Sequence, residues 1–180
     1  MNLGDRQKTI FLDRDGTLIE EVNFLSRSED VSLFPFTRDA VELLKSNGFR
    51  LIVITNQSGI GRGLFSEEAM HTIHRGIQQE LDGAIDAYYF CPHLPEAGCH
   101  CRKPNLGMIE AAQSEFAIDL SESWCVGDKD LDIELGYNAG LRTVLVETGY
   151  GREHAKTLDR QPEKVLANLL EAAKYITAQV

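Results

Sequence analysis

The segment TIFLDRDGT at residues 9–17 decides the fold. Its first four residues form an apolar, β-rich run, which is typical of a strand buried on both faces of a sheet. Asp13 and Asp15 follow this run two positions apart, so both carboxylates can face one cleft, and Gly16 permits the sharp turn that the chain needs there. An ordinary Asp-Gly turn has the same local pattern. The rest of the chain must therefore distinguish the two interpretations.

Further apolar runs alternate with helical patterns along the chain. They predict strands at residues 51–54, 87–90, 124–126 and 143–146, and helices at residues 38–46, 66–81, 108–116 and 162–178. Asn47-Gly48 is expected to end the first helix, and Ser66 is the expected N-cap of the second. The alternation predicts an α/β fold with three layers, in which a mostly parallel sheet is covered by helices on both faces.

Polar residues with chemical potential follow the predicted strands rather than precede them. Thr55 and Asn56 follow the second strand, Cys91 the third and Asp128 the fourth. Sheets of this kind bind ligands at the carboxyl ends of their strands. These residues and the two acids after the first strand are therefore expected at the carboxyl ends of the strands, where a ligand would bind.

The charge balance restricts the partners of the chain. Its formal net charge is −10, from 18 basic and 28 acidic residues, whereas a nucleic-acid or anionic-membrane binder depends on a basic surface. The apolar runs are too short to cross a bilayer, and residues 1–6 lack the apolar core of a secretory signal, so a cytoplasmic protein is expected. No linker or repeat divides the chain, and residues 1–180 are expected to form one domain.

Two acidic segments indicate phosphoryl chemistry. Asp13 could accept a phosphoryl group, and Asp15 could transfer protons at the leaving and attacking oxygens. The segment GDKDLD at residues 127–132 places three more acids after a strand. Asp128 together with Asp13 could bind Mg²⁺, which prefers oxygen ligands. Acids that stabilise the dipole of a helix N-terminus would account for Asp130 and Asp132, but would explain less well why Lys129 interrupts the acids beside the candidate metal ligand.

Two polar segments offer partners for a phosphate group. Residues 55–58, Thr-Asn-Gln-Ser, supply hydroxyl, amide and backbone donors at the end of a strand. Lys103 could neutralise the phosphate and keep a nearby nucleophile ionised, and Arg102 could form a bidentate contact with a substrate oxygen. The glycine-rich run at residues 59–63 lacks the Rossmann spacing, so no dinucleotide site is expected.

Three of the four cysteines lie between positions 91 and 101. Cys91, Cys99 and Cys101 together with one imidazole suit tetrahedral Zn²⁺, and their crowded spacing predicts a closed, structural site. Such a site would stiffen the loop that delivers Arg102 and Lys103. Two histidines of this segment, at positions 93 and 100, are candidates for the fourth ligand.

The remaining thiol and two further imidazoles are expected to have no metal role. Cys125 lies in a predicted buried strand and is expected to be an inert core residue. His71 and His74 lie one turn apart on a predicted helix without an acidic partner motif, and are expected to be surface or core residues.

Taken together, these motifs resemble those of the haloacid dehalogenase superfamily of phosphatases. Asp13-x-Asp15-Gly16-Thr17, Thr55-Asn56, Lys103 and Gly127-Asp128-x-x-x-Asp132 occur in that order. Within the superfamily, residues from about 10 to 151 are similar to the D-glycero-D-manno-heptose 1,7-bisphosphate 7-phosphatases, through TNQSGIGRG at 55–63, CPH at 91–93 and CRKP at 101–104. The resemblance implies a Rossmann-like fold without a large cap domain, a catalytic Mg²⁺ and a structural Zn²⁺.

The resemblance also implies a role for each site residue. Asp13 would be the nucleophile and a Mg²⁺ ligand, and Asp15 the general acid and base, whose backbone carbonyl also binds the metal. Asp128 would complete the Mg²⁺ site, and Thr55 and Lys103 would hold the phosphoryl group. The implied substrate-binding residues are Glu21, Val22, Asn23, Phe24, Thr55, Asn56, Gln57, Ser58, Arg102, Lys103 and Lys129. The implied zinc ligands are Cys91, His93, Cys99 and Cys101.

The implied activity is the Mg²⁺-dependent removal of the 7-phosphate from the heptose bisphosphate through an aspartyl-phosphate. The loop between His93 and Cys99 is shorter than in many heptose phosphatases and matches the histidinol-phosphate phosphatases, so histidinol phosphate is the alternative substrate. The heptose anomer stays open. The product would feed the synthesis of nucleotide-activated heptose for cell-envelope polysaccharide. The missing cap and the lack of an apolar surface stripe favour a monomer.

Overall fold

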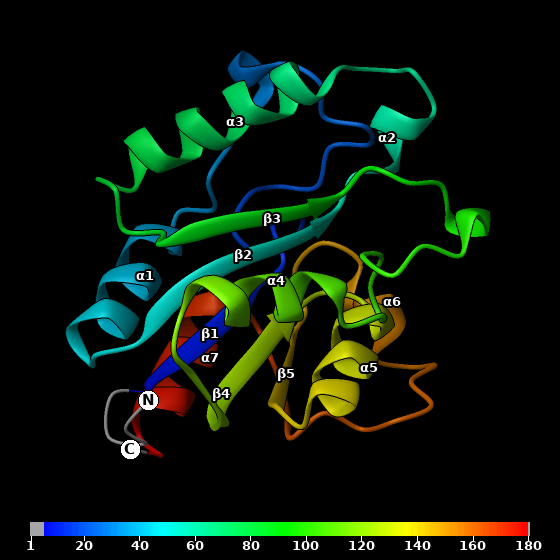
Figure 1. The fold of residues 1–180 in the computed structure, drawn as a ribbon. Coiled ribbons are helices and arrows are strands. Elements are labelled where there is room, and N and C mark those ends of the chain that lie inside the picture. Colours follow the sequence, from blue (N-terminus) through cyan, green and yellow to red (C-terminus); the bar gives the residue numbers. More distant parts are fainter. Residues whose placement is uncertain (1–5, 180) are drawn as a thin grey trace.

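A six-stranded parallel sheet forms the centre of the molecule (Figure 1). The structure is a computed structural model and describes residues 6–179, so both ends of the expected 1–180 domain lie outside the described residues. The strands follow the order β3-β2-β1-β4-β5-β6, and all neighbours pair in parallel. Their bounds are β1 Gln7–Leu12, β2 Arg50–Asn56, β3 Ala87–Cys91, β4 Ile118–Gly127, β5 Arg142–Val146 and β6 Lys164–Leu166.

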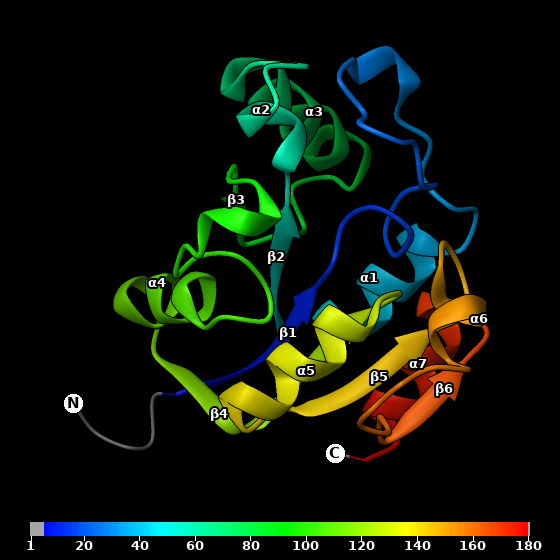
Figure 2. The same cartoon turned by 90° about the vertical axis from the view of Figure 1, so that its right-hand side faces the viewer.

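Helices cover both faces of this sheet, as the apolar runs predict (Figure 2). Side chains alternate between the faces, so Ile10 of β1 belongs to one core cluster and its neighbour Phe11 to the other. The first cluster includes residues of α1 (Thr37–Ser46), α3 (Glu67–Glu80) and α7 (Leu169–Thr177). The second includes residues of α4 (Gly107–Glu115) and α5 (Asp130–Ala139). The α/β class with three layers is thereby confirmed.

The expected ends of two helices are confirmed in detail. Asn47 is the C-cap of α1, and Gly48 adopts a φ of 81°, which glycine reaches without steric cost. The Ser66 side chain accepts a hydrogen bond of 3.2 Å from the backbone N–H of Ala69, so Ser66 is the N-cap of α3.

The helix predicted at residues 162–178 is wrong in its first third. Lys164–Leu166 instead forms the edge strand β6, which pairs with β5, and α7 begins only at Leu169. The backbone hydrogen bonds of the sheet outweigh a weak local preference here. Asn168 marks the true start, because its side chain accepts a hydrogen bond of 3.1 Å from the N–H of Glu171.

Three helices were absent from the predicted list: α2 (Ser58–Gly61), α5 and α6 (Gly151–His154). α5 contains Gly136, which packs so tightly against Thr143 and Cys125 that a Cβ there would overlap Thr143. A glycine in mid-helix lowers local helix propensity, so only the packing against the sheet explains why this segment is helical. The segment predicted as a strand at 124–126 also begins earlier, at Ile118.

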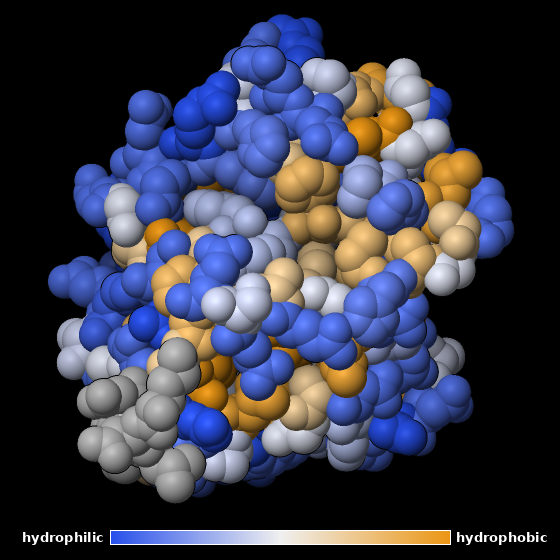
Figure 3. Space-filling view, in the orientation of Figure 1, coloured by the Kyte–Doolittle hydropathy of each residue, from blue (hydrophilic) through white to orange (hydrophobic). Residues whose placement is uncertain are grey.

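Within residues 6–179, the insertion after β1 is a loop with one short 3₁₀ helix, η2 (Ser28–Asp30), rather than a large cap domain. None of the helices in that part of the chain is long and apolar enough to cross a membrane. The space-filling view in Figure 3 shows a mostly hydrophilic face, with apolar patches concentrated towards the side where Figure 1 places the loops after β2 and β3. These loops and the insertion surround the carboxyl ends of the strands.

Candidate active site

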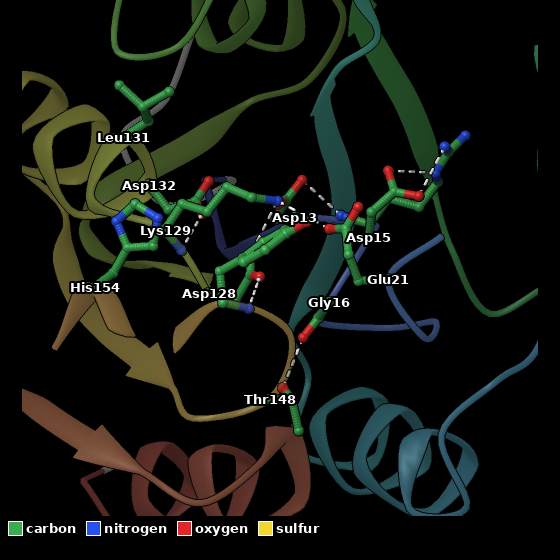
Figure 4. A network of polar contacts seen from close by, with 12 residues as sticks. Asp13, Asp15, Gly16, Glu21, Asp128, Lys129, Leu131, Asp132, Thr148 and His154 are labelled. Atoms are coloured by element: carbon green, nitrogen blue, oxygen red, sulfur yellow. Dashed lines mark hydrogen bonds and ion pairs between the residues drawn. The ribbon is translucent and has the colours of Figure 1, made fainter. Parts of the chain in front are cut away.

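The carboxyl ends of β1, β2 and β4 surround a cavity of about 140 Å³. Its lining consists of Asp13, Asp15, Thr55, Asn56, Arg102, Lys103, Lys129, Leu131 and Asp132. The residues that follow the first two strands meet here, Asp128 lies beside Asp13, and Cys91 belongs instead to a separate cluster with Cys99 and Cys101. In Figure 4, Asp13 lies between Asp128 and Asp132 on one side and Asp15 and Glu21 on the other.

Asp13 is buried and held in one orientation. Its backbone N–H donates to the carbonyl of Val126 at 2.9 Å, and its Oδ1 accepts from the backbone N–H of Arg14 at 2.8 Å. Lys103 Nζ lies 2.9 Å from the same Oδ1. Burial opposes ionisation, but the charges of Lys103 and Lys129 outweigh it, so the pKa of Asp13 is lowered. An ionised, oriented carboxylate is what nucleophilic attack requires.

Lys103 is a buried cation shared by two carboxylates. Its Nζ lies 2.7 Å from Asp132 Oδ1, in addition to the contact with Asp13, and donates to the carbonyl of Ile54 at 3.0 Å. Burial alone would lower the pKa of Lys103, but the two aspartates raise it above its ordinary value. Asn56 fixes the backbone of the lysine, because its Oδ1 accepts from the Lys103 N–H at 3.0 Å. Lys103 is thus held as a permanent positive charge beside Asp13.

Asp13, Asp128 and Asp132 offer carboxylate oxygens within 4.8 Å of one another. Tyr150 N–H donates to Asp128 Oδ2 at 2.8 Å, whereas Asp128 Oδ1 is buried and has no hydrogen-bond partner among the described residues. Burial, and then the charge of Asp13, raise the pKa of Asp128 to about 8. Lys129 Nζ lies 3.5 Å from Asp128 Oδ1. A hard divalent cation bound by these oxygens would give Asp128 Oδ1 a direct partner and compensate the repulsion between the carboxylates. The donor set therefore fits Mg²⁺.

Two glycines allow the chain to approach Asp128 closely. A Cβ on Gly16 or on Gly149 would overlap the Asp128 carboxylate, and both glycines have positive φ, 80° and 54°. Thr148 Oγ1 donates to the carbonyl of Gly16 at 2.6 Å and so joins the two turns. The loop after β5 therefore holds the candidate metal ligand against the loop after β1.

Arg14 and Gln57 hold the carboxylate of Asp15, which lines the cavity. Arg14 Nε and Nη2 donate to its Oδ2 and Oδ1 at 3.0 and 2.9 Å, and Gln57 Nε2 donates to Oδ2 at 2.9 Å. The same Gln57 amide donates to Thr55 Oγ1 at 2.7 Å. Gln57 thus links two of the predicted catalytic side chains.

A second cavity, of about 120 Å³, adjoins the first and contains most of the substrate-binding residues that the resemblance implies. Lys129 and Glu21 both line it, and their Nζ and Oε2 atoms are 3.1 Å apart. The rest of residues 21–24 and residues 56–58 also belong to the lining. Phe24 adopts a φ of 52° and places its exposed ring near Arg62. Arg102 lies in the first cavity instead, so the structure brings this predicted set to two adjoining spaces.

The predicted zinc ligands cluster in the loop after β3. One donor atom of each of Cys91, His93, Cys99 and Cys101 lies within 4.8 Å of the others. His93 Nδ1 is 3.2 Å from Cys101 Sγ, whereas His100 Nε2 contacts Glu110 Oε2 at 2.6 Å. The geometry therefore favours His93 over His100 as the fourth donor. Three sulfur atoms and one nitrogen at this spacing could hold a tetrahedral metal ion.

Three residues of the site had no role in the sequence analysis. Asp132 appears there only as part of a motif and among the acids of a helix N-terminus. An acid three positions after the N-cap residue Lys129 is, however, a signal of a capping contact. In the structure, Asp132 Oδ2 does accept a hydrogen bond of 3.1 Å from the Lys129 backbone N–H. Arg14 and His74 gave no usable signal. Cys125 is buried, as expected. Of the two helical histidines that were expected at the surface or in the core, His74 is buried and His71 is exposed.

Comparison with known proteins identifies the family. A family model described as HAD-hydrolase-like matches residues 100–172. A D-glycero-D-manno-heptose-1,7-bisphosphate 7-phosphatase of Thermosynechococcus vestitus is 38% identical over 188 aligned residues, covering 93% of this chain and 94% of the relative. The chain belongs to this phosphatase family. A D-glycero-beta-D-manno-heptose-1,7-bisphosphate 7-phosphatase of Haemophilus ducreyi is 35% identical, and the alignment covers 94% of this chain and 98% of that relative.

A solved phosphatase has the same fold over almost its whole length. The D,D-heptose 1,7-bisphosphate phosphatase of B. bronchiseptica, complexed with magnesium and phosphate, superposes with a TM-score of 0.89 at 30% identity. The match covers 96% of this chain and 99% of that one. The membership and the absence of a large cap within residues 6–179 agree with what the motifs imply.

Proposed function

We propose that this phosphatase removes the 7-phosphate of D-glycero-D-manno-heptose 1,7-bisphosphate, with Asp13 as the nucleophile. The observation that carries the proposal is the buried Asp13–Lys103 pair, 2.9 Å apart at the wall of the first cavity. An ionised acceptor beside a fixed positive charge supports attack on a phosphoryl group bound in this cavity. The family membership over nearly the whole chain supports the substrate.

Two displacements complete the proposed reaction. In the first, a carboxylate oxygen of Asp13 bonds to phosphorus and the bond to the sugar oxygen breaks, with its electron pair going to that oxygen. Asp15 gives the leaving oxygen a proton. In the second, Asp15 takes a proton from a water molecule whose oxygen attacks phosphorus, and the bond to Asp13 breaks to release inorganic phosphate. The net reaction consumes one water.

Lys103 and Thr55 are proposed to hold the phosphoryl group during both displacements. Lys103 is fixed by Asp132 and by Asn56, so its charge needs no reorganisation as the transition state forms. Asp13, Asp128 and the backbone carbonyl of Asp15 are the proposed Mg²⁺ ligands, with Asp132 close by. When bound, Mg²⁺ would neutralise the charge on the phosphoryl oxygens.

The remaining proposed contacts recognise the substrate and stiffen its surroundings. Lys129 and Arg102 supply positive charge on two sides of the site, and Glu21 can accept hydrogen bonds from sugar hydroxyls. Zn²⁺ bound by the cluster of three cysteines and His93 would stiffen the loop that leads directly into Arg102 and Lys103. The small second cavity agrees with a small-molecule partner.

The proposal is tested by phosphate release from purified protein with Mg²⁺. The kcat/KM for the heptose 1,7-bisphosphate, in each anomer, is compared with the kcat/KM for histidinol phosphate, because this ratio measures differential transition-state binding. A large preference for a bisphosphate is expected. A preference for histidinol phosphate would keep the chemistry and overturn the substrate. No release from either substrate would overturn the activity itself.

Two properties of the whole protein are also proposed. We infer a monomer, as the missing large cap within residues 6–179 leads us to expect. Light scattering at assay concentration checks it. We infer a cytoplasmic location, since cysteine thiolates persist as metal ligands in a reducing compartment. Cell fractionation followed by an activity assay checks the location.

A further inference from the structure

Arg14 is a buried cation between the two catalytic aspartates of the sequence motif. Only 1% of the residue is exposed. Its guanidinium donates two hydrogen bonds to the Asp15 carboxylate, from Nε to Oδ2 and from Nη2 to Oδ1. A buried charge is tolerated only with close partners. Two of the three guanidinium nitrogens are therefore committed to Asp15.

The third guanidinium nitrogen faces a histidine from another element. Arg14 Nη1 lies 3.3 Å from Nε2 of His74, which belongs to α3 and is 5% exposed. Guanidinium groups only donate, so Nε2 must be the unprotonated nitrogen that accepts. Burial, and then the charge of Arg14, lower the pKa of His74 to about 3, which agrees with a neutral ring.

His74 is itself held in place by packing on the edge strand. Its ring stacks on Tyr88 of β3 with centroids 4.5 Å apart. The Tyr88 hydroxyl donates to Gln78 Oε1 at 3.2 Å, and Gln78 Nε2 donates to the carbonyl of Ile85 at 2.8 Å. A chain of fixed groups thus runs from α3 and β3 through Arg14 to the carboxylate of Asp15.

The arrangement distinguishes the two oxygens of Asp15. Oδ2 accepts from both Arg14 Nε and Gln57 Nε2, whereas Oδ1 accepts only from Arg14 Nη2 among the described residues. A carboxylate oxygen has about two lone-pair sites. Oδ1 therefore has a free site for a proton and Oδ2 does not.

We propose that Arg14, backed by His74, is a positioning residue that fixes Asp15 so that its Oδ1 carries the proton to the leaving oxygen. The inference rests on the proposed function, since it assigns Asp15 the acid role in that reaction. Arg14 acts through the carboxylate of Asp15, and His74 acts through Arg14. Their effect is on the geometry of proton transfer, and geometry errors near 1 Å can cost on the order of 100-fold in rate.

The experiment uses the leaving group as a reporter. The sugar oxygen is a poor leaving group that needs a proton, whereas p-nitrophenolate leaves without one. We expect His74→Phe, which keeps a ring beside Tyr88 but removes the acceptor, to lower kcat/KM for the heptose bisphosphate by on the order of 10-fold or more. The kcat/KM for p-nitrophenyl phosphate should change by less than about 3-fold. His74→Gln, which restores an acceptor, should recover most of the loss.

The matched control is His71→Gln, because His71 is an exposed residue one turn earlier on the same helix. It should leave both substrates unaffected. Equal losses for the two substrates in His74→Phe would overturn the positioning role, since that pattern reports a general structural defect. Arg14→Lys, which keeps the charge but cannot form the fork, gives the same comparison if the phenylalanine variant does not fold.

The tautomer of His74 provides a test on the unaltered protein. Ring ¹⁵N chemical shifts, assigned by comparison with His74→Gln, should show a neutral imidazole with its proton on Nδ1. A proton on Nε2, or an imidazolium at pH 7, would overturn the contact with Arg14. Failure of the unaltered protein to hydrolyse either substrate would instead count against the proposed function.

Discussion

At the scale of single residues, the site depends on charges that are buried in pairs and triplets. Lys103 contacts both Asp13 and Asp132 while only 4% exposed. Removing one member of such a group leaves an uncompensated charge, which is strongly destabilising in a protein interior. The ion pairs that keep Asp13 and Lys103 charged therefore also affect the stability of the folded site.

Asp13→Asn should abolish turnover, because an amide cannot accept the phosphoryl group as the carboxylate does. The loss of kcat should be at least on the order of 10³-fold. Phosphate release in a continuous assay measures it, and circular dichroism checks that the fold persists. A folded variant that retained activity would remove Asp13 from the nucleophile role.

Asp132→Asn tests whether the orientation of Lys103 matters for catalysis. The amide oxygen can still accept a hydrogen bond from Lys103, but the charge that balances the lysine is lost. We expect kcat to fall on the order of 10-fold with a smaller change in KM, since the interaction matters most in the transition state. Steady-state kinetics check this split. An unchanged kcat would mean that Asp13 alone is sufficient to place the lysine.

At the scale of elements, the sheet edge and the helix caps decide where the C-terminal segment becomes helical. Lys164–Leu166 pairs with β5, and Asn168 then caps α7, which packs beside α1 on one face of the sheet. The cap satisfies a backbone N–H that the first turn would otherwise leave without a partner.

Asn168→Ala should therefore lower the free energy of unfolding by about 1 kcal/mol. For a chain of this size, that corresponds to a decrease in Tm of about 2–4 °C. Urea and thermal unfolding measure both values. Asn168→Asp is the matched control, because the aspartate carboxylate can still cap the helix and should leave the free energy of unfolding nearly unchanged. Equal losses of stability in both variants would show that the side chain stabilises the protein by packing and not by capping.

The cysteine loop is an element whose stiffness is proposed to come from a metal. Replacing Cys99 and Cys101 together with serine should remove close to one equivalent of Zn²⁺ and lower activity through a looser Arg102–Lys103 segment. Elemental analysis measures the zinc, and hydrogen exchange of residues 99–107 measures the loop. Cys125→Ser, outside the cluster, is the control. Unchanged zinc content would refute the assigned ligand set.

At the scale of the whole molecule, buried groups with shifted pKa values make stability depend on pH. The pKa of His74 is lowered to about 3 in the folded chain, by burial first and then by Arg14, from an ordinary value of 6.5. Below pH 6.5 His74 binds a proton in the unfolded chain but stays unprotonated in the folded chain until the pH approaches 3. The folded state is therefore progressively disfavoured as the pH falls from about 6.5 towards 3.

The difference between the unaltered protein and His74→Gln isolates this contribution. The free energy of unfolding of the unaltered protein should fall relative to the variant by on the order of a few kcal/mol between pH 7 and pH 4. Urea unfolding at a series of pH values measures the difference. A difference that stays constant over this range would show that His74 is not a buried neutral group.

The sequence by itself determined the parallel sheet, the residues at the carboxyl ends of its strands and the candidate zinc ligands. These follow from local patterns: apolar runs, turn residues and ligand spacing within about ten positions. Only the tertiary structure decided that Asp132 holds Lys103, 29 residues away in the chain, and that His74 contacts Arg14, 60 residues away. It also moved the start of the last helix to Leu169. These outcomes depend on contacts between distant segments, whose energies no local pattern encodes.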